Sequence, residues 1–170
     1  MILMTERLLL RPARRDDLAA MHDIMSRPPA MRFWSTPEHE TLSETEAFLE
    51  ATLTAANQRE SDEFLIELNG RVIGKAGAWK LPEIGFILHP DFWRKGLVEE
   101  ALRAVIPHLF SRHDMDALTA EVDPRNTASW RLLHRLGFAE THRASRTMQW
   151  REEWCDSIYL ALRRDAYNSR

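Results

Sequence analysis

Cysteine is almost missing from this sequence, with one residue, Cys155, among 170. A single cysteine excludes an intramolecular disulfide and is typical of a protein that works in a reducing compartment. A long hydrophobic run is missing too, because Glu6, Arg7 and Arg11 interrupt the apolar start well before the length of a signal peptide or a membrane span. We therefore expect a soluble, cytoplasmic protein with no membrane partner.

The sequence also has no surplus of positive charge. Its 23 Lys and Arg residues stand against 26 Asp and Glu residues, and the basic residues are spread along the chain or occur as pairs such as Arg14-Arg15. A nucleic-acid-binding domain normally shows a basic patch, so nucleic acid is not an expected partner. The length and the 44% hydrophobic content suit one globular domain over residues 1–170.

Several familiar catalytic motifs are absent. Neither the P-loop pattern G-x-x-x-x-G-K-[ST] nor G-x-G-x-x-G occurs. The seven histidines are scattered, without H-E-x-x-H or a cysteine cluster, so no metal site is expected. There is no G-x-S-x-G, and Cys155 has no cysteine-protease signature around it, which favours a structural role for that thiol.

Hydrophobic periodicity and turn residues predict an α/β chain in the order strand, two helices, three strands, helix, strand, helix, two strands. The expected strands are 8–11, 64–68, 72–79, 83–88, 117–122, 139–147 and 157–162. The expected helices begin at Asp16, Ser43, Gly96 and Asn126. A strand–helix–strand unit in the middle indicates a mixed sheet.

Local signals give some of the boundaries. Asn69-Gly70 predicts a hairpin turn, because both residues tolerate positive φ. Ser43-x-x-Glu46 has the capping-box pattern. Residues 30–41 are expected to form a loop, and Pro107 is expected to kink or end the helix that contains it.

The most informative segment is a strand that leads through a basic, glycine-containing turn into a helix. Such a turn directs backbone N–H groups and the positive end of the helix dipole at whatever lies above it, which favours an anion such as a diphosphate. Arg94 and Lys95 add charge, and Gly96 permits close approach of the backbone. Taken alone, the turn favours an ordinary strand-to-helix connection with exposed basic residues, because short basic glycine turns are common.

Three motifs in the correct order carry a resemblance to a known family. The segment EIGFILHPDFWRKGLVEEAL, from Glu83 to Leu102, resembles the coenzyme A-binding motif of the GNAT N-acetyltransferase superfamily. Asn126-x-x-Ser129 followed by Gly137-Phe138 resembles its companion motif, and TERLLLRP at 5–12 resembles the opening of the ribosomal-protein N-terminal acetyltransferases. The resemblance spans nearly the whole chain.

The resemblance implies a GNAT-like, mostly antiparallel sheet of about seven strands, with the fourth and fifth splayed apart, and about four flanking helices. It further implies acetyl-CoA as co-substrate and no metal. The implied cofactor-binding residues are Phe86, Ile87, Leu88, Arg94, Lys95, Gly96, Leu97, Val98, Asn126 and Ser129. Three positions depart from the family pattern, because Trp93, Val98 and Leu133 stand where Gln or Arg, Gly or Ala, and a tyrosine proton donor are usual.

The same resemblance implies direct transfer of acetyl from the thioester to a primary amine. Glu83 is the first candidate for the general base, with Glu121 and Asp123 in reserve, although a solvated carboxylate at a strand end is a comparable interpretation. Ser129 is the candidate that protonates the departing thiolate, or it only caps the helix or contacts the cofactor. The chain is expected to act as a monomer or a homodimer.

The resemblance implies that the acceptor is a peptide N-terminus or a small amine. Phe33 and Trp34 are expected to form one wall of its pocket, and Trp150 and Trp154 the other. Because no acidic cluster is evident at this mouth, an uncharged or mildly polar acceptor is favoured over a polycation. The alternative function is a non-catalytic acyl-CoA-binding sensor or regulatory module.

Overall fold

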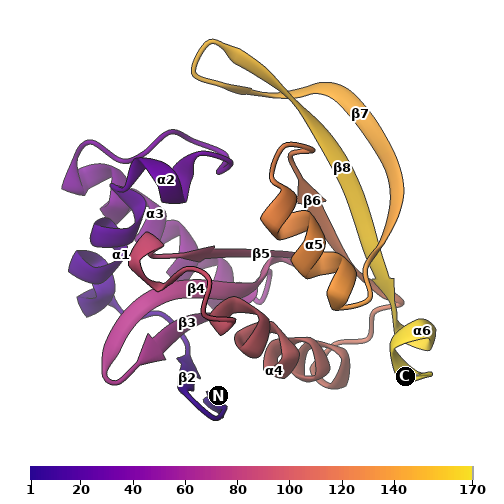
Figure 1. Cartoon of the computed structure of the whole chain (residues 1–170). Helices are drawn as coiled ribbons and strands as arrows, with labels where there is room; N and C mark the ends of the chain where they lie inside the picture. Colours follow the sequence, from indigo (N-terminus) through magenta and orange to yellow (C-terminus); the bar gives the residue numbers. More distant parts are fainter. Residues whose placement is uncertain (170) are drawn as a thin grey trace.

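One open sheet of eight strands, in the order β1-β2-β3-β4-β5-β6-β8-β7, organises the computed structural model, which describes residues 1–169 (Figure 1). The strands are β1 (Leu3–Met4), β2 (Leu8–Arg11), β3 (Asp62–Leu68), β4 (Arg71–Lys80), β5 (Glu83–Leu88), β6 (Ala117–Val122), β7 (Ala139–Trp150) and β8 (Glu153–Arg163). All neighbours pair antiparallel except β5 and β6, which are parallel. The helix that connects this parallel pair begins at Leu97, after a 3-10 turn at Pro90–Phe92 that follows β5.

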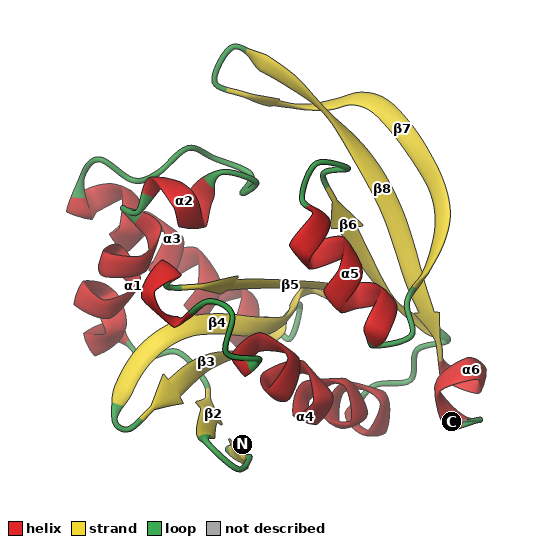
Figure 2. Ribbon diagram, in the orientation of Figure 1, coloured by secondary structure: helices red, strands yellow, loops and turns green. Residues whose placement is uncertain are grey.

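The helices cover both faces of the sheet (Figure 2). They are α1 (Leu18–Met25), α2 (Pro28–Met31), α3 (Leu42–Asn57), α4 (Leu97–Arg112), α5 (Thr127–Arg135) and α6 (Arg164–Asn168), with 3-10 turns at Arg15–Asp17 and Pro90–Phe92. The expected mixed α/β fold with two splayed central strands is confirmed. Within residues 1–169 the sheet has one strand more than expected, because Leu3–Met4 pairs with β2, and the short helices α2 and α6 were not foreseen.

Two apolar cores lie on opposite faces of the sheet, as the alternation of β3 shows. Phe64 and Ile66 belong to the larger core, which the apolar sides of α4 and α5 complete. Leu65, between them in sequence, belongs to the smaller core with Met21 and Ile24 of α1. The sheet is therefore buried on both faces at its centre, and this holds the edge of β5 in place.

Local chemistry explains where the boundaries differ from expectation. Thr41, not Ser43, caps α3 by accepting a hydrogen bond from the Glu44 backbone N–H at 3.3 Å, so the capping box expected at Ser43 and Glu46 is wrong. Residues 30–41 are not all loop, because Pro28 begins the one-turn helix α2.

The later elements run further than their sequence patterns indicated. Helix α4 continues past Pro107 to Arg112 instead of ending early. The final hairpin is also longer than 139–147 and 157–162, since β7 and β8 pair as far as Trp150 and Glu153. The Asn69-Gly70 turn is confirmed, with φ of 50° and 82°. Within the described chain, no helix is long and apolar enough to span a membrane.

Candidate active site

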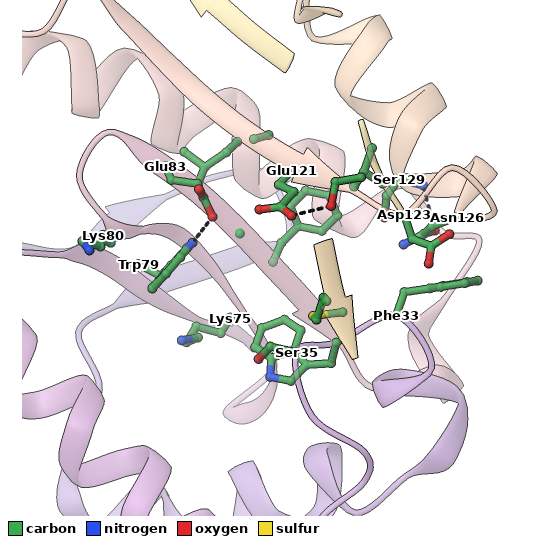
Figure 3. A pocket seen from close by; sticks show the side chains of 18 of the residues that line it. Phe33, Ser35, Lys75, Trp79, Lys80, Glu83, Glu121, Asp123, Asn126 and Ser129 are labelled. Atoms are coloured by element: carbon green, nitrogen blue, oxygen red, sulfur yellow. Dashed lines mark hydrogen bonds between the residues drawn. The ribbon is translucent and has the colours of Figure 1, made fainter. Parts of the chain in front are cut away.

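Strands β5 and β6 touch at one end only and then separate. Their single registered pair is Glu83 with Thr119. Beyond that pair, a cavity of about 800 Å³ opens between the strands (Figure 3). A parallel pair that stops after one residue leaves the backbone polar groups of β5 without a strand partner on that side, so the cavity offers hydrogen bonds as well as space.

The orientation of the β5 backbone follows from its pairing with β4. The His89 N–H donates to the Ile73 carbonyl at 2.7 Å, so the backbone polar groups of His89 are directed at β4. Because these groups alternate in direction along a strand, those of Ile87 are directed at β4 as well. Phe86 and Leu88 therefore face the open edge. Of the three backbone positions implied by the resemblance, Ile87 is the one whose polar groups are already taken up by β4.

Trp93 closes the far end of this edge. Its indole N–H donates to the Leu88 carbonyl at 2.9 Å, which leaves the Phe86 amide and carbonyl and the Leu88 amide as the open groups. Trp93 thus has a defined structural role at the position where the family pattern has Gln or Arg. It ties the end of β5 to the turn that follows.

The turn that follows has the geometry of an anion cradle. Arg94 and Gly96 have φ of 63° and 71°, and Leu97 begins the 16-residue helix α4. Left-handed residues at a helix start gather successive N–H groups at the positive end of the helix dipole. Gly96 takes this conformation without strain. These residues fit a bound diphosphate.

Glu83 lies at the closed end of the splay and lines the cavity. Burial raises the pKa of this carboxyl, and the nearby Glu121 carboxylate raises it further, while a hydrogen bond of 2.8 Å from the Trp79 indole N–H opposes both (Figure 3). A carboxylate with a raised pKa accepts a proton more readily than an exposed one. Glu83 therefore has the properties of a general base.

The two reserve carboxylates have other partners. Glu121 accepts a hydrogen bond of 2.5 Å from the Ser157 hydroxyl, which itself lies 2.5 Å from the Thr147 hydroxyl. Burial alone would raise the pKa of Asp123, but hydrogen bonds from Arg125 lower it below its ordinary value. Asp123 is consequently a weaker base than Glu83.

The companion motif faces the same cavity from α5. Asn126 caps the helix, since its side-chain oxygen accepts from the Ser129 backbone N–H at 3.3 Å. The Ser129 side chain lines the cavity, so its hydroxyl is placed to meet a ligand. Leu133, one turn further along, lines the cavity too and supplies only apolar surface there.

Of the two walls expected for the acceptor pocket, only the first lines this cavity. Phe33 and Trp34 line the cavity, and Trp34 packs edge-on against Phe48 at 6.3 Å between ring centroids. Trp150 and Trp154 lie outside the lining, because the hairpin carries them past the cavity. The hairpin contributes Thr147, Met148, Asp156 and Ser157 instead.

Acidic side chains dominate the charge of the lining, which sequence reasoning missed. They come from β3, β5, β6, β8, the segment before β3 and the residue after β6, and they are Glu60, Glu63, Glu83, Glu121, Asp123 and Asp156. Lys75 and Lys80 are the two basic residues among the described lining. Lys75 is engaged by Glu63 at 2.6 Å. No local pattern in the sequence marks this cluster, since its members lie up to 96 residues apart (156 − 60).

Comparison with known proteins agrees with the site. The family model described as an acetyltransferase (GNAT) domain matches residues 7–139, so this chain belongs to the GNAT acetyltransferase family. It is therefore an N-acetyltransferase of the class that uses acetyl-CoA. The match covers both motifs and the walls formed by the first helices.

The individual relatives share only a modest sequence identity with this chain. The chain is 26% identical to an uncharacterized N-acetyltransferase, p20, of Bacillus licheniformis, over 80% of this chain and 81% of that one. It is also 26% identical to the spermidine N(1)-acetyltransferase of Escherichia coli K12, over 76% and 72%. The solved structure of RimL, a ribosomal L7/L12 alpha-N-protein acetyltransferase in complex with coenzyme A, superposes with a TM-score of 0.87 at 19% identity, over 98% and 99%. That last likeness is one of fold.

Proposed function

We propose that this enzyme acetylates a primary amine whose proton is taken up by Glu83, and that the amine belongs to a small molecule with a further positive charge. The observation that carries the proposal is a cavity between splayed strands with a raised-pKa carboxyl at its closed end and an excess of carboxylates around it.

The cofactor is assigned to the open edge of β5 and the turn after it. Acetyl-CoA supplies an activated thioester. The Phe86 amide and carbonyl and the Leu88 amide are positioned to pair with its arm, and the N–H groups from Arg94 to Val98 with its diphosphate. A backbone N–H on this edge is a donor for the thioester carbonyl oxygen, the role of an oxyanion hole.

Glu83 and Ser129 divide the proton transfers. An amine must lose a proton to attack, and Glu83 is the cavity carboxyl whose pKa is raised. Ser129 lies on α5 and lines the same cavity, so its hydroxyl is assigned to the departing thiolate. Glu121 acts on Glu83 through its charge, which raises the pKa of the base.

The charge of the cavity decides the acceptor class. Among the lining carboxylates, Glu60, Glu83, Glu121 and Asp156 form no ion pair with a basic side chain of residues 1–169. Unpaired carboxylates attract cations and disfavour anions. A second cationic group favours such a cavity, so we replace the uncharged acceptor favoured by the sequence with a di- or polyamine. The relative that is named a spermidine N(1)-acetyltransferase supports this choice.

A panel of amines tests the proposal. Free thiol released from acetyl-CoA is measured with polyamines, α-amino peptides, hydrophobic monoamines and aminoglycosides, and each product is identified by mass spectrometry. We expect the highest kcat/KM for a flexible di- or polyamine, with a rate that falls as salt rises. Glu83→Gln is assayed beside the wild type and gives the rate of thiol release without the proposed base.

The outcomes separate the parts of the proposal. Preference for an α-amino peptide would overturn the charged acceptor and leave the enzyme class intact. Tight binding of acetyl-CoA without turnover by any amine would favour the sensor instead.

A further inference from the structure

The N-terminal segment reaches across to the cofactor turn. The Arg7 guanidinium donates through Nε to the Glu100 carboxylate at 2.6 Å, and through Nη1 to the Lys95 backbone carbonyl at 2.9 Å. The Arg7 backbone N–H and the Thr5 hydroxyl bond the same carboxylate at 2.8 and 2.5 Å. Four hydrogen bonds therefore join residues 5–7 to the turn and the first turn of α4.

Glu100 needs this arrangement for an electrostatic reason. Burial alone would raise the pKa of its carboxyl, but the hydrogen bonds from Thr5 and Arg7 lower it, so Glu100 stays ionised at neutral pH. A bare negative charge in the first turn of α4 would repel a diphosphate bound at the same end. Arg7 neutralises it, as Arg103 and Arg135 do for Glu99, the other acidic residue of that turn.

The remaining nitrogen of Arg7 points to a further role. Nη2 forms no hydrogen bond within the described residues and lies 3.8 Å from the place where a Cβ on Gly96 would stand. The side chain as a whole is 44% exposed. An arginine held rigidly by its other two nitrogens, with one donor left open beside an anion cradle, is prearranged for a phosphate oxygen.

We propose that Arg7 completes the diphosphate site of this enzyme from outside the coenzyme A motif. It holds the Lys95 carbonyl away from the anion, cancels the charge of Glu100 and donates Nη2 to the diphosphate. The inference rests on the proposed placement of the cofactor at the turn 94–98. Arg7 is thus a binding and positioning residue of the cofactor site.

Arg7→Gln tests the inference by comparing ligands with and without the diphosphate. The dissociation constant for coenzyme A is measured by calorimetry, and kcat/KM is measured with acetyl-CoA and with S-acetylpantetheine, which lacks the nucleotide. We expect coenzyme A to bind about 10- to 100-fold more weakly, in line with one charge-assisted hydrogen bond. The rate with S-acetylpantetheine should stay within about twofold of wild type, because that donor makes no contact with the turn.

A matched control and a second variant complete the experiment. Arg15→Gln removes an exposed arginine that pairs with Glu50 on α3, away from the cofactor turn, and the activity with both donors should stay unchanged. Arg7→Lys keeps a cation but cannot bond Glu100, Lys95 and a phosphate together, so we expect a loss of coenzyme A affinity smaller than that of Arg7→Gln. If Arg7→Gln does not fold, Arg7→Lys provides the test.

Unchanged coenzyme A affinity in Arg7→Gln would overturn the inference. An equal loss with both donors would also overturn it, since that pattern indicates general damage to the fold. Failure of the wild type to bind coenzyme A would instead contradict the proposed cofactor site.

Discussion

The proposed cofactor half and the proposed acceptor half of the active site are built in different ways. The groups that we assign to the cofactor are almost continuous in sequence, from Phe86 on β5 through the turn to Val98, and are mostly backbone amides. The acceptor half is assembled from side chains of α3, β3, β4, β6, the hairpin β7–β8 and residues 33–35. A backbone cradle tolerates many side chains, whereas an acceptor cavity changes with each lining residue.

Arg125 illustrates how the acceptor half is held together. It hydrogen-bonds Asp123 at the end of β6 and Glu153 on β8, and it lies 5.8 Å from the ring centroid of Phe33. A second ion pair, between Arg151 and Glu38 at 2.7 Å, joins the hairpin tip to the segment after α2. Side-chain contacts therefore close the mouth across three separate segments.

The largest effect is expected when the cofactor cradle is broken. Gly96→Glu forces a side chain into a left-handed conformation and places a carboxylate beside the diphosphate and Arg7. Coenzyme A affinity, measured by calorimetry, should fall by at least about 100-fold.

Gly70→Glu is the matched control for this change. Gly70 has φ of 82° and open space around it, so the variant carries the same backbone strain and charge in the β3–β4 turn. Its coenzyme A affinity should remain that of wild type. Similar losses in both variants would show that strain, not the anion site, is responsible.

Glu83→Gln should have the next largest effect, on turnover rather than binding. Loss of the base should lower kcat by about 100-fold while the KM for acetyl-CoA changes little. The wild-type rate should fall as pH drops through the raised pKa of Glu83, because the carboxyl must be ionised to accept a proton.

The pH–rate profile checks this assignment. The variant should lack the acidic limb, and Glu121→Gln should keep the limb but move it to lower pH, since the neighbouring charge that raises the Glu83 pKa is gone. A Glu83→Gln variant with full activity would transfer the role of base to another group.

A smaller effect is expected at the acceptor mouth. Arg125→Gln removes the contact between β6, β8 and Phe33, so the acceptor KM should rise by about 3- to 10-fold while coenzyme A affinity is unchanged. Steady-state kinetics with the preferred amine measures this. Arg143→Gln is the control: it breaks an exposed ion pair with Glu140 on β7 and should leave the acceptor KM unchanged.

The smallest effect concerns stability. A carboxyl whose pKa is raised in the folded protein stabilises the fold fully below its unfolded pKa, and this contribution is lost as pH rises through the folded pKa. Glu83→Gln removes the buried charge, so its Tm at neutral pH should be equal to or slightly above that of wild type, and the difference should vanish near pH 4. A clear destabilisation at neutral pH would show that favourable contacts of the ionised carboxylate, such as the hydrogen bond from Trp79, outweigh the cost of its burial.

Sequence reasoning succeeded where the physical cause is local. Alternation identified seven of the strands, Asn69-Gly70 identified the β3–β4 turn, and the motif around Gly96 identified the family that the comparison confirmed. It failed where two local signals compete. Thr41 and Ser43 are both good caps, and the helix begins after Thr41, whose hydroxyl accepts a hydrogen bond from the Glu44 backbone N–H.

The candidate site shows the same division. Glu83 and Phe86 could be assigned from the strand that carries them, and the structure places both in the cavity. The opposite orientation of Ile87, the exclusion of Trp150 and Trp154 and the contact of Arg7 with Lys95 depend on pairing between distant segments.

By itself, the sequence determined the order of the main elements, the glycine-containing turn that leads into α4 and the class of chemistry, because each depends on contiguous residues and backbone geometry. Only the tertiary structure decided which carboxylates share the acceptor cavity, how the environment shifts the pKa of Glu83 and Asp123, and that the N-terminal Arg7 stands beside Gly96. The physical reason is that burial and charge–charge interaction act through space, so they depend on distances that the fold sets between residues far apart in the chain.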